Sequence, residues 1–388
     1  MPKLSKIVDI NDLRNAAKSR LPRGVFDYLD GAAEAEVTLR ENIDAFGDWI
    51  FRPRNGSKVT KVESRRKVCG TDLAMPMILA PIGYSRLLHP RGEIAAAKGA
   101  TAAGITYALP TIAGHAIERV RAEATGPLWY QLYTIGGRDT VEPALARARK
   151  AGYETLLVTI DTPVAGMRER DVRNGNAKLL GKSLFGKIPY LPEIMMHPRW
   201  LWNFLMDGGV PALPNIVING KPLELIDVSL ALSDAILTWD DMKWVRAAWP
   251  GPIAMKGVLT AEDGKRCVDV GAQGLVVSNH GGRQLDGVAA TLRVLPEIVQ
   301  AVGSQIEVLF DGGVRRGADV VKALCMGARA VLLGRGYAYG MAAFGDEGVK
   351  RAVEIFFADF DRTMKLLGCD SIDKLDMTYL EPARRLLK

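Results

Sequence analysis

Eight short apolar runs, most of them separated by helical patterns, constrain the fold of this 388-residue chain more than any other feature. They cover residues 75–82, 105–109, 128–133, 155–160, 252–256, 274–277, 307–310 and 330–333. Continuous apolar strands are typical of parallel sheets, because helices bury both faces of such a sheet. Eight strand–helix units predict a single α/β domain over residues 1–388, folded as a (β/α)8 TIM barrel.

The segments between the runs support this fold. Helical patterns cover 92–103, 140–151, 261–270 and 318–326, and a glycine that can cap a helix C-terminus follows each of them: Gly104, Gly152, Gly271 and Gly327. Thr260 is the predicted N-cap of the third helix. An open nucleotide-binding sheet would need a Gly-x-Gly-x-x-Gly turn after its first strand, where this chain has Ala-Pro-Ile-Gly at 80–83.

Two long segments interrupt the alternation. Residues 1–70 precede the first strand, and we expect a helical extension that covers the bottom or the rim of the barrel. Residues 174–240 lie in a connection of roughly ninety residues between the fourth and fifth strands, where about thirty are usual. We expect them to form an insertion on the catalytic face.

The composition excludes several classes of protein. The net charge of +7 slightly favours anionic partners, but the chain has no dense Lys/Arg tract or RNA-binding motif, so we expect no nucleic-acid partner. The four cysteines lie far apart, which indicates reduced thiols in a cytoplasmic protein. Neither the cysteines nor the four histidines have metal-ligand spacing, so we expect no metal. We also expect no signal peptide and no membrane-spanning helix.

Polar residues gather at the ends of the predicted strands, where catalytic groups lie in such barrels. The first strand ends in Pro81, Ile82 and Gly83, the third carries Gln131 and Tyr133, and the fourth carries Thr159 and Asp161, with Arg168 shortly after it. The fifth strand ends in Lys256, and the sixth is followed by Ser278, His280 and Arg283. The seventh strand is followed by Asp311, Gly313 and Arg315, and the eighth by Gly334 and Arg335. Polar groups at so many strand ends indicate one active site.

The stretch Ser-Asn-His-Gly-Gly-Arg-Gln-Leu-Asp at 278–286 is the most informative of these ends. His280 can take a proton near neutral pH, and Arg283 can bind a carboxylate. A base beside an anion clamp suits proton abstraction from a small acid. A lone His-x-x-Arg would more often be a histidine with its hydrogen bonds made inside the fold and an arginine on the surface. The position of this stretch at a strand end disfavours that structural interpretation.

A phosphate site is predicted after the last two strands. Gly313 with Arg315, and Gly334 with Arg335, place backbone N–H groups and two guanidiniums where barrels commonly bind phosphate. The pattern implies a phosphorylated cofactor or substrate.

These motifs carry a resemblance to a known family. The stretch 278–286, Asp-Gly-Gly-Val-Arg-Arg-Gly at 311–317 and Val-Thr-Ile-Asp-Thr-Pro at 158–163 resemble those of the FMN-dependent L-2-hydroxy-acid oxidising enzymes, which include lactate dehydrogenase, mandelate dehydrogenase and glycolate oxidase. The resemblance covers nearly the whole chain. It implies FMN as the cofactor and oxidation of an L-2-hydroxy acid, of the lactate or mandelate type, to the 2-oxo acid.

The resemblance also implies a role for each residue that would meet the substrate. His280 would be the base, and Asp161 would orient it and stabilise its protonated form. Tyr133 would hydrogen-bond near the substrate hydroxyl. Arg168 and Arg283 would hold the substrate carboxylate, assisted by Tyr28.

The implied cofactor site uses other strand ends. Lys256 would lie beside the N1–O2 edge of the flavin and stabilise its reduced form. The flavin ring would be lined by Pro81, Ile82, Gly83, Gln131, Thr159 and Ser278. Asp311 would also contact the cofactor, and Gly313, Arg315, Gly334 and Arg335 would hold its phosphate.

Several of these residues also have a purely structural interpretation. Lys256 and Asp161 could form an ion pair inside the barrel, although buried charges are costly. Tyr28 could simply pack an N-terminal helix, and Tyr133 could fill the barrel. Arg168 lies in Arg-Glu-Arg-Asp, whose alternating charges are typical of a solvated face.

The loop after the second strand departs from the family pattern. Relatives usually have a hydroxyl residue that helps to bind flavin where this chain has Pro110, so that contact is lost or passes to Thr111. Ile112 and His115 also differ from glycolate oxidase. Gly83 resembles the dehydrogenase branch, which passes its electrons to a quinone or another carrier.

Residues 179–206 combine apolar and aromatic side chains with scattered cations, which suits an interfacial segment lying on a membrane. Membrane-bound relatives dock through this loop, and relatives are commonly homotetramers. The alternative is a lid or subunit contact. We expect a cytoplasmic protein, at the inner face of the cell membrane if this segment docks there.

Two other functions stay open at this stage. The chain could be an oxidase that passes its electrons to oxygen and forms hydrogen peroxide. It could also be a flavin barrel that acts on a different substrate.

Overall fold

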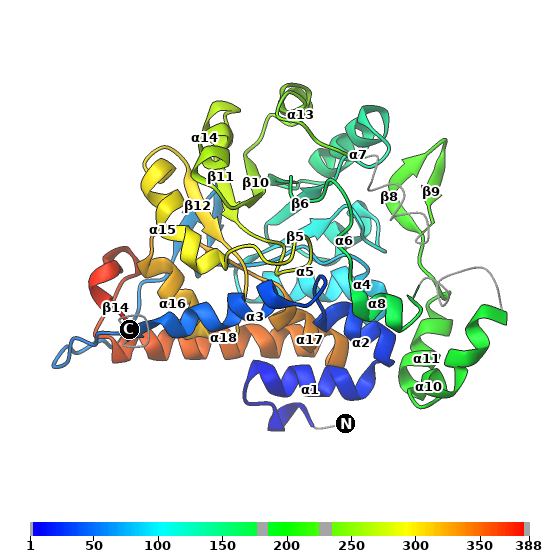
Figure 1. The fold of residues 1–388 in the computed structure, drawn as a ribbon, viewed down its shortest axis with the longest axis horizontal. Coiled ribbons are helices and arrows are strands. Elements are labelled where there is room, and N and C mark those ends of the chain that lie inside the picture. Colours follow the sequence, from blue (N-terminus) through cyan, green and yellow to red (C-terminus); the bar gives the residue numbers. More distant parts are fainter. Residues whose placement is uncertain (1–2, 177–184, 225–234, 384–388) are drawn as a thin grey trace.

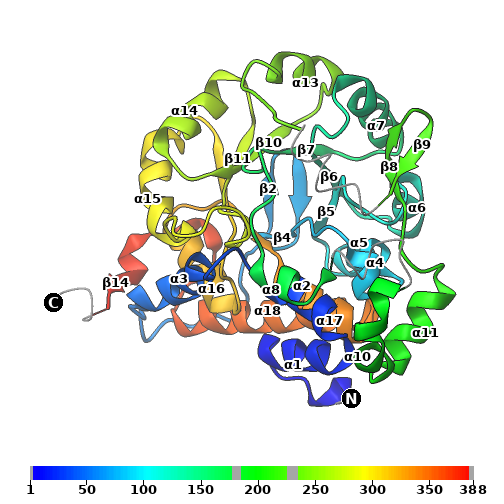
Figure 2. The same ribbon diagram turned by 45° about the vertical axis from the view of Figure 1, so that its right-hand side comes forward.

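The computed structural model describes residues 3–176, 185–224 and 235–383. Eight parallel strands close into one barrel, in the order β10, β11, β12, β13, β4, β5, β6, β7 (Figure 2). They are β4 (Met77–Leu79), β5 (Thr106–Pro110), β6 (Leu128–Leu132), β7 (Thr155–Thr159), β10 (Ile253–Val258), β11 (Gly274–Val277), β12 (Glu307–Phe310) and β13 (Val331–Leu333). Each overlaps one of the predicted runs, which confirms the TIM barrel.

Helices surround the barrel (Figure 1). In chain order they are α4 (Ser85–Leu88), α5 (Gly92–Ala102), α6 (Ile117–Glu123), α7 (Arg138–Lys150), α13 (Met242–Ala248), α14 (Ala261–Asp269), α15 (Thr291–Val302), α16 (Gly317–Cys325), α17 (Arg335–Phe344) and α18 (Asp346–Leu366). The predicted caps are confirmed. Thr260 accepts a hydrogen bond from the Asp263 N–H, and the four capping glycines have φ between 65° and 98°.

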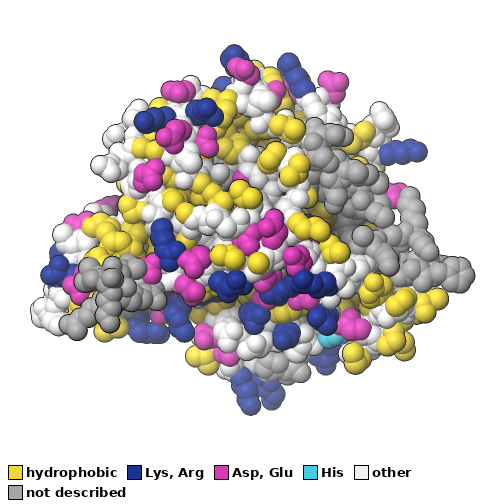
Figure 3. Space-filling model, viewed as in Figure 1, with side chains coloured by type: hydrophobic (Ala, Val, Ile, Leu, Met, Phe, Trp, Pro, Cys, Tyr) yellow, Lys and Arg dark blue, Asp and Glu magenta, His cyan; other side chains and the backbone are white. Residues whose placement is uncertain are grey.

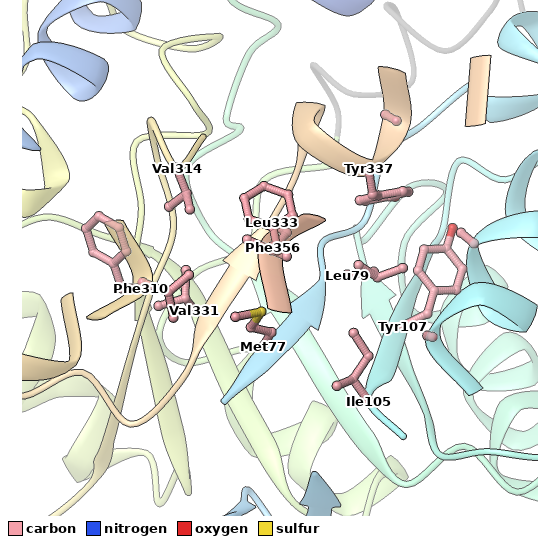
Figure 4. Packing of buried hydrophobic residues seen from close by; sticks show 14 of the residues in the cluster. Met77, Leu79, Ile105, Tyr107, Phe310, Val314, Val331, Leu333, Tyr337 and Phe356 are labelled. Carbon is pink, nitrogen blue, oxygen red and sulfur yellow. The ribbon is translucent and has the colours of Figure 1, made fainter. Parts of the chain in front are cut away.

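The core has two layers, one on each side of the barrel wall. Inside, Ile78, Leu157 and Leu332 pack around Trp129. Outside, side chains such as Tyr107 pack against the surrounding helices (Figure 4). A hairpin of β2 (Arg66–Val68) and β3 (Thr71–Leu73) contacts the first residues of β7 and β12 and so closes the bottom of the barrel.

Residues 3–70 contain three α-helices and two short strands. The helices are α1 (Ile10–Arg20), which starts with a capping box at Asp9, α2 (Arg23–Asp30) and α3 (Val37–Asp44); η1 (Leu4–Lys6) and η2 (Ala45–Asp48) are short 3-10 turns. β1 (Trp49–Phe51) pairs with β14 (Leu380–Pro382), near η5 (Ile372–Lys374) and η6 (Met377–Tyr379). Helix α1 packs on α17, whereas α2 lies at the rim of the barrel.

The segment between β7 and β10 leaves the barrel intact, because these two strands pair directly, with Leu156 opposite Ile253. It contains α8 (Glu169–Arg173), η3 (Phe185–Tyr190), α10 (Leu191–Met195), α11 (Pro198–Met206) and a hairpin of β8 (Leu213–Ile218) and β9 (Lys221–Leu223). Residues 179–184 of the predicted docking segment lie outside the described residues. Within those described, no helix is both long and apolar enough to cross a membrane.

Candidate active site

The site is a pocket lined by residues at the carboxyl ends of the barrel strands and by Tyr28 and Leu29 of α2. The predicted residues that line it are Tyr28, Pro81, Ile82, Gly83, Gln131, Tyr133, Thr159, Arg168, Lys256, His280, Arg283, Asp311, Gly313, Arg315, Gly334 and Arg335. Three other predicted residues, Thr111, Asp161 and Ser278, lie behind this lining and hydrogen-bond to residues in it. The structure therefore brings the predicted set together.

The loop after β11 holds His280 in a rare backbone conformation. His280 has φ 58°, and Gly281 and Gly282 follow with φ 65° and 77°. A non-glycine residue in this region costs energy and persists only where its surroundings fix it. Here the His280 N–H donates to Ser278 Oγ (3.1 Å), and a Cβ at Gly282 would come within 2.7 Å of the Leu39 backbone nitrogen. The tight turn aims the imidazole into the pocket.

Asp161 orients the His280 ring. His280 Nδ1 lies 3.0 Å from Asp161 Oδ1, and His280 Nε2 lies 3.4 Å from the Tyr133 hydroxyl. Burial alone would raise the pKa of Asp161, but His280 and Lys256 outweigh burial and lower it. Asp161 therefore stays ionised beside the imidazole, which leaves Nε2 as the nitrogen that can act in the pocket.

Two arginines and Tyr28 meet on the opposite side of the base. The guanidinium carbons of Arg283 and Arg168 lie 4.8 and 6.0 Å from the centre of the Tyr28 ring. Arg168 pairs with Asp171 at 2.9 Å, whereas Arg283 has no carboxylate partner within the described residues and donates to the carbonyls of Tyr28 and Gly31. Burial and the charge of Arg168 lower the pKa of Arg283. An anion bound here would offset that repulsion.

Lys256 provides a buried positive charge in the floor of the pocket. Its Nζ donates to Ser278 Oγ (3.0 Å) and lies 3.3 Å from Asp311 Oδ2. Burial lowers the pKa of Lys256, but Asp311 and Asp161 outweigh burial and raise it. The ion pair is thus with Asp311 and not with Asp161. Asp311 Oδ1 has no hydrogen-bond partner among the described residues, so this oxygen can still accept a hydrogen bond from a ligand.

Arg315 and Arg335 also line the pocket, and Arg335 is the first residue of α17. Arg335 donates through its three nitrogens to the carbonyls of Leu29, Gly281 and Gly31, at 2.7 to 3.1 Å. Burial and the charge of Arg283 lower the pKa of Arg335 to about 10. A helix N-terminus flanked by cations favours an anion.

Comparisons with known proteins agree with this geometry. The family model of FMN-dependent dehydrogenases matches residues 17–382. The chain belongs to this family. It is 41% identical over 373 residues to an L-lactate dehydrogenase of Caulobacter vibrioides, covering 95% of this chain and 96% of the relative. It is 38% identical over 385 residues to the (S)-mandelate dehydrogenase of Pseudomonas putida, covering 97% and 94%.

A solved structure described as the monotopic membrane protein (S)-mandelate dehydrogenase is similar over the whole fold. Its TM-score is 0.91 at 37% identity, and the match covers 97% of this chain and 100% of that one. The predicted family and its FMN cofactor are therefore confirmed, and the protein is an FMN-dependent oxidoreductase.

The pocket fits FMN. The phosphate suits the end with Arg315, Arg335 and the start of α17, where a Cβ added to Gly334 would meet nothing within 4 Å. The flavin ring suits the strand ends, where Lys256 supplies a charge and Asp311 Oδ1 an unused acceptor. The residues that would hold FMN are thus those predicted at the ends of β10, β12 and β13.

The wall beside Pro110 is braced by Gln131 and Thr111. Gln131 Nε2 donates to Thr159 Oγ1 (3.0 Å), and the Thr111 hydroxyl donates to the Gln131 carbonyl (2.6 Å). The Thr111 side chain is buried, and its oxygen also accepts from the Tyr133 N–H. Thr111 therefore holds the wall in place, and its hydroxyl hydrogen is already donated to the Gln131 carbonyl.

Sequence reasoning did not single out Tyr84, which also lines the pocket. Its ring meets that of Tyr28 edge to face, with 5.4 Å between the centres, and its φ of 60° is again in the left-handed region. The one available signal was its place directly after Gly83 at a strand end. Ile112, noted only as a departure from the family pattern, lies in the same lining.

Proposed function

We propose that the protein oxidises an L-2-hydroxy acid of the lactate or mandelate type to the 2-oxo acid, with the residue roles inferred from the sequence. The observation that carries the proposal is the position of His280. Its Nε2 is free of the Asp161 contact and lies in the same pocket as the paired guanidiniums of Arg168 and Arg283. A carboxylate held by these arginines presents the neighbouring hydroxyl to the base.

The side chains divide the work of the reaction. Arg168 and Arg283 bind the substrate carboxylate in a buried site, where charge-assisted hydrogen bonds are strong. His280 Nε2 accepts the proton of the substrate hydroxyl, and Asp161 stabilises the imidazolium that forms. Tyr133, 3.4 Å from Nε2, can donate to the substrate oxygen. FMN, when bound, supplies the two-electron acceptor for the hydrogen on the α-carbon.

An anaerobic absorbance titration tests this function. The purified protein with bound FMN is mixed with L-lactate, L-mandelate, glycolate and longer L-2-hydroxy acids, and the D-enantiomers are the controls. Bleaching of the flavin by an L-acid alone is the expected result. A yellow protein that none of these acids bleaches would remove the hydroxy-acid assignment. Oxygen uptake after reduction then separates an oxidase from a dehydrogenase that needs a quinone or another carrier.

We also propose that α10 and α11 dock on a membrane surface and that the acceptor is a lipid-soluble carrier such as a quinone. Hydrophobic side chains gather over these helices (Figure 3). On α11, Trp202, Leu205 and Met206 are 66%, 61% and 69% exposed, and Met195 and Met196 are equally open. Such an apolar face beside scattered cations is typical of interfacial helices. The similar solved structure described as monotopic supports the same interpretation.

Flotation with liposomes of phosphatidylglycerol and phosphatidylethanolamine tests the docking. The chain should float with the vesicles, and the double variant Trp202→Glu/Leu205→Glu should stay behind while its flavin is still bleached. If the chain does not float, and the variant instead lowers the mass measured by sedimentation, the face is a subunit contact and the docking proposal is wrong.

A further inference from the structure

The loop that carries Arg168 is fastened to α2 by a second arginine. Arg170 lies two residues beyond Arg168, at the start of α8, and α8 lies against α2 at the rim of the pocket (Figures 1 and 2). Its guanidinium pairs with three carboxylates of the N-terminal segment: Asp27, Asp30 and Glu36. These acids are largely buried, so they need a cation near them.

The carboxylates that Arg170 contacts lie on the segment that supplies the other half of the substrate clamp. Asp27 and Asp30 flank Tyr28, and the Tyr28 and Gly31 carbonyls accept from Arg283. Asp30 is itself fixed from two sides, by Arg14 (2.6 Å) and by the Tyr339 hydroxyl (2.7 Å). The acceptor for Arg170 is therefore a rigid part of the fold.

Arg168 has few other anchors. Its Nε pairs with Asp171 on its own turn, and the nearest backbone tie to the N-terminal segment is the Glu34 N–H donating to the Met167 carbonyl (2.7 Å). Further along α8, Asn174 donates to Asp27 (2.7 Å). Among these contacts, Arg170 is the one that brings a positive charge. It pairs with the residues at both ends of the segment from Asp27 to Glu36.

We propose that Arg170 is a positioning residue that sets Arg168 beside Tyr28 and Arg283, so that the carboxylate clamp is assembled before the substrate arrives. This inference rests on the proposed role of Arg168. Without Arg170, the three carboxylates lose the cation that they share. Among the described residues, the Arg168 loop then keeps only hydrogen bonds from neutral side chains to α2, from Asn174 to Asp27 and from Asn176 to the Gly24 carbonyl. The loss falls mainly on binding, because Arg170 pairs with Asp27, Asp30 and Glu36 and contacts neither His280 nor Asp161. The His280–Asp161 pair stands in the loops after β11 and β7.

Steady-state kinetics and a binding titration test the proposal. Arg170→Met should raise KM for the L-2-hydroxy acid by about ten- to a hundredfold and lower kcat much less. The dissociation constant of the 2-oxo acid, measured from the flavin absorbance without turnover, should rise in parallel. Arg170→Lys should recover part of both. Arg173→Met is the matched control, since Arg173 lies on the same helix, is exposed and pairs with Glu169 on that helix.

A double-mutant cycle separates positioning from a general loss of structure. If Arg170 acts through Arg168, adding Arg170→Met to Arg168→Lys should raise KM little further. Full additivity, or an unchanged KM in Arg170→Met, would overturn the inference. If Arg168→Lys alone leaves KM unchanged, the proposed role of Arg168 is wrong instead. Should Arg170→Met fail to fold, Asp27→Asn removes one of its partners and should give a smaller rise in KM of the same kind.

Discussion

His280 with Asp161 and His115 with Glu93 form similar histidine–carboxylate pairs, but the two carboxylates differ in whether both of their oxygens accept hydrogen bonds. Asp161 lies in the loop after β7, whereas Glu93 lies in the first turn of α5. Glu93 is completely buried, and its second oxygen accepts from the Gly114 N–H at 3.0 Å. Asp161 Oδ2 has no hydrogen-bond partner among the described residues, and His280 has a strained backbone and faces the pocket. The pair proposed to react is thus the one whose carboxylate keeps an oxygen without a hydrogen-bond donor among the described residues.

The largest expected effect is the loss of the base. His280→Asn should lower the rate of flavin reduction by about three to four orders of magnitude, because the proposed reaction uses His280 Nε2 as the acceptor of the hydroxyl proton. Stopped-flow absorbance measures this rate. The flavin content should stay near that of the parent protein, and a variant that reduces at the parental rate would contradict the assigned role.

The partner of the base should matter less. Asp161→Asn keeps the shape of the side chain but removes the charge that stabilises the imidazolium, so the reduction rate should fall by about a hundredfold. The same stopped-flow measurement applies. A drop as large as that of His280→Asn, with the FMN lost, would indicate that Asp161 chiefly maintains the fold.

The second pair should affect stability and not chemistry. Glu93→Leu leaves the Gly114 N–H and the His115 ring without their buried acceptor, so the free energy of unfolding should fall by about 1–3 kcal/mol. Chemical denaturation followed by circular dichroism measures this change. If Glu93→Leu instead abolishes flavin reduction at full stability, the comparison between the two pairs fails.

The smallest effect concerns pH. The folded-state pKa of Asp161 is lowered, so its ionised form stabilises the fold above the usual aspartate pKa near 4, and this contribution is lost as pH falls through the lowered value. Asp161→Asn should therefore flatten the acid side of a plot of unfolding free energy against pH. Denaturation at several pH values between about 3 and 6 checks this, and an unchanged acid slope would remove Asp161 as its source.

Much of this molecule could be predicted from patterns. The strands, the capping glycines and Thr260 follow from periodicity and from the φ values that glycine permits. The strand-end residues meet in one pocket because a closed parallel barrel brings those ends together.

The remaining features have no such signature. The contacts of Arg335 are with backbone carbonyls, which every residue carries. The alternating charges around Arg168 are typical of a solvated face. The carboxylates that pair with Arg170 lie more than a hundred residues away in the chain. The partner of Lys256, Asp311, depends on which strands become neighbours.

The placement of α1 and α2 also has a consequence for synthesis on the ribosome. Residues 7–29 are translated before the barrel, but several of their partners follow it. Arg20 donates to the Ala343 carbonyl, Arg351 donates to the Ile7 carbonyl, and Arg335 donates to the Leu29 carbonyl. At about 5–20 residues per second, the N-terminal segment waits many seconds with its apolar faces uncovered. A nascent chain of this protein thus cannot complete the packing of its first helices until its last two long helices have emerged.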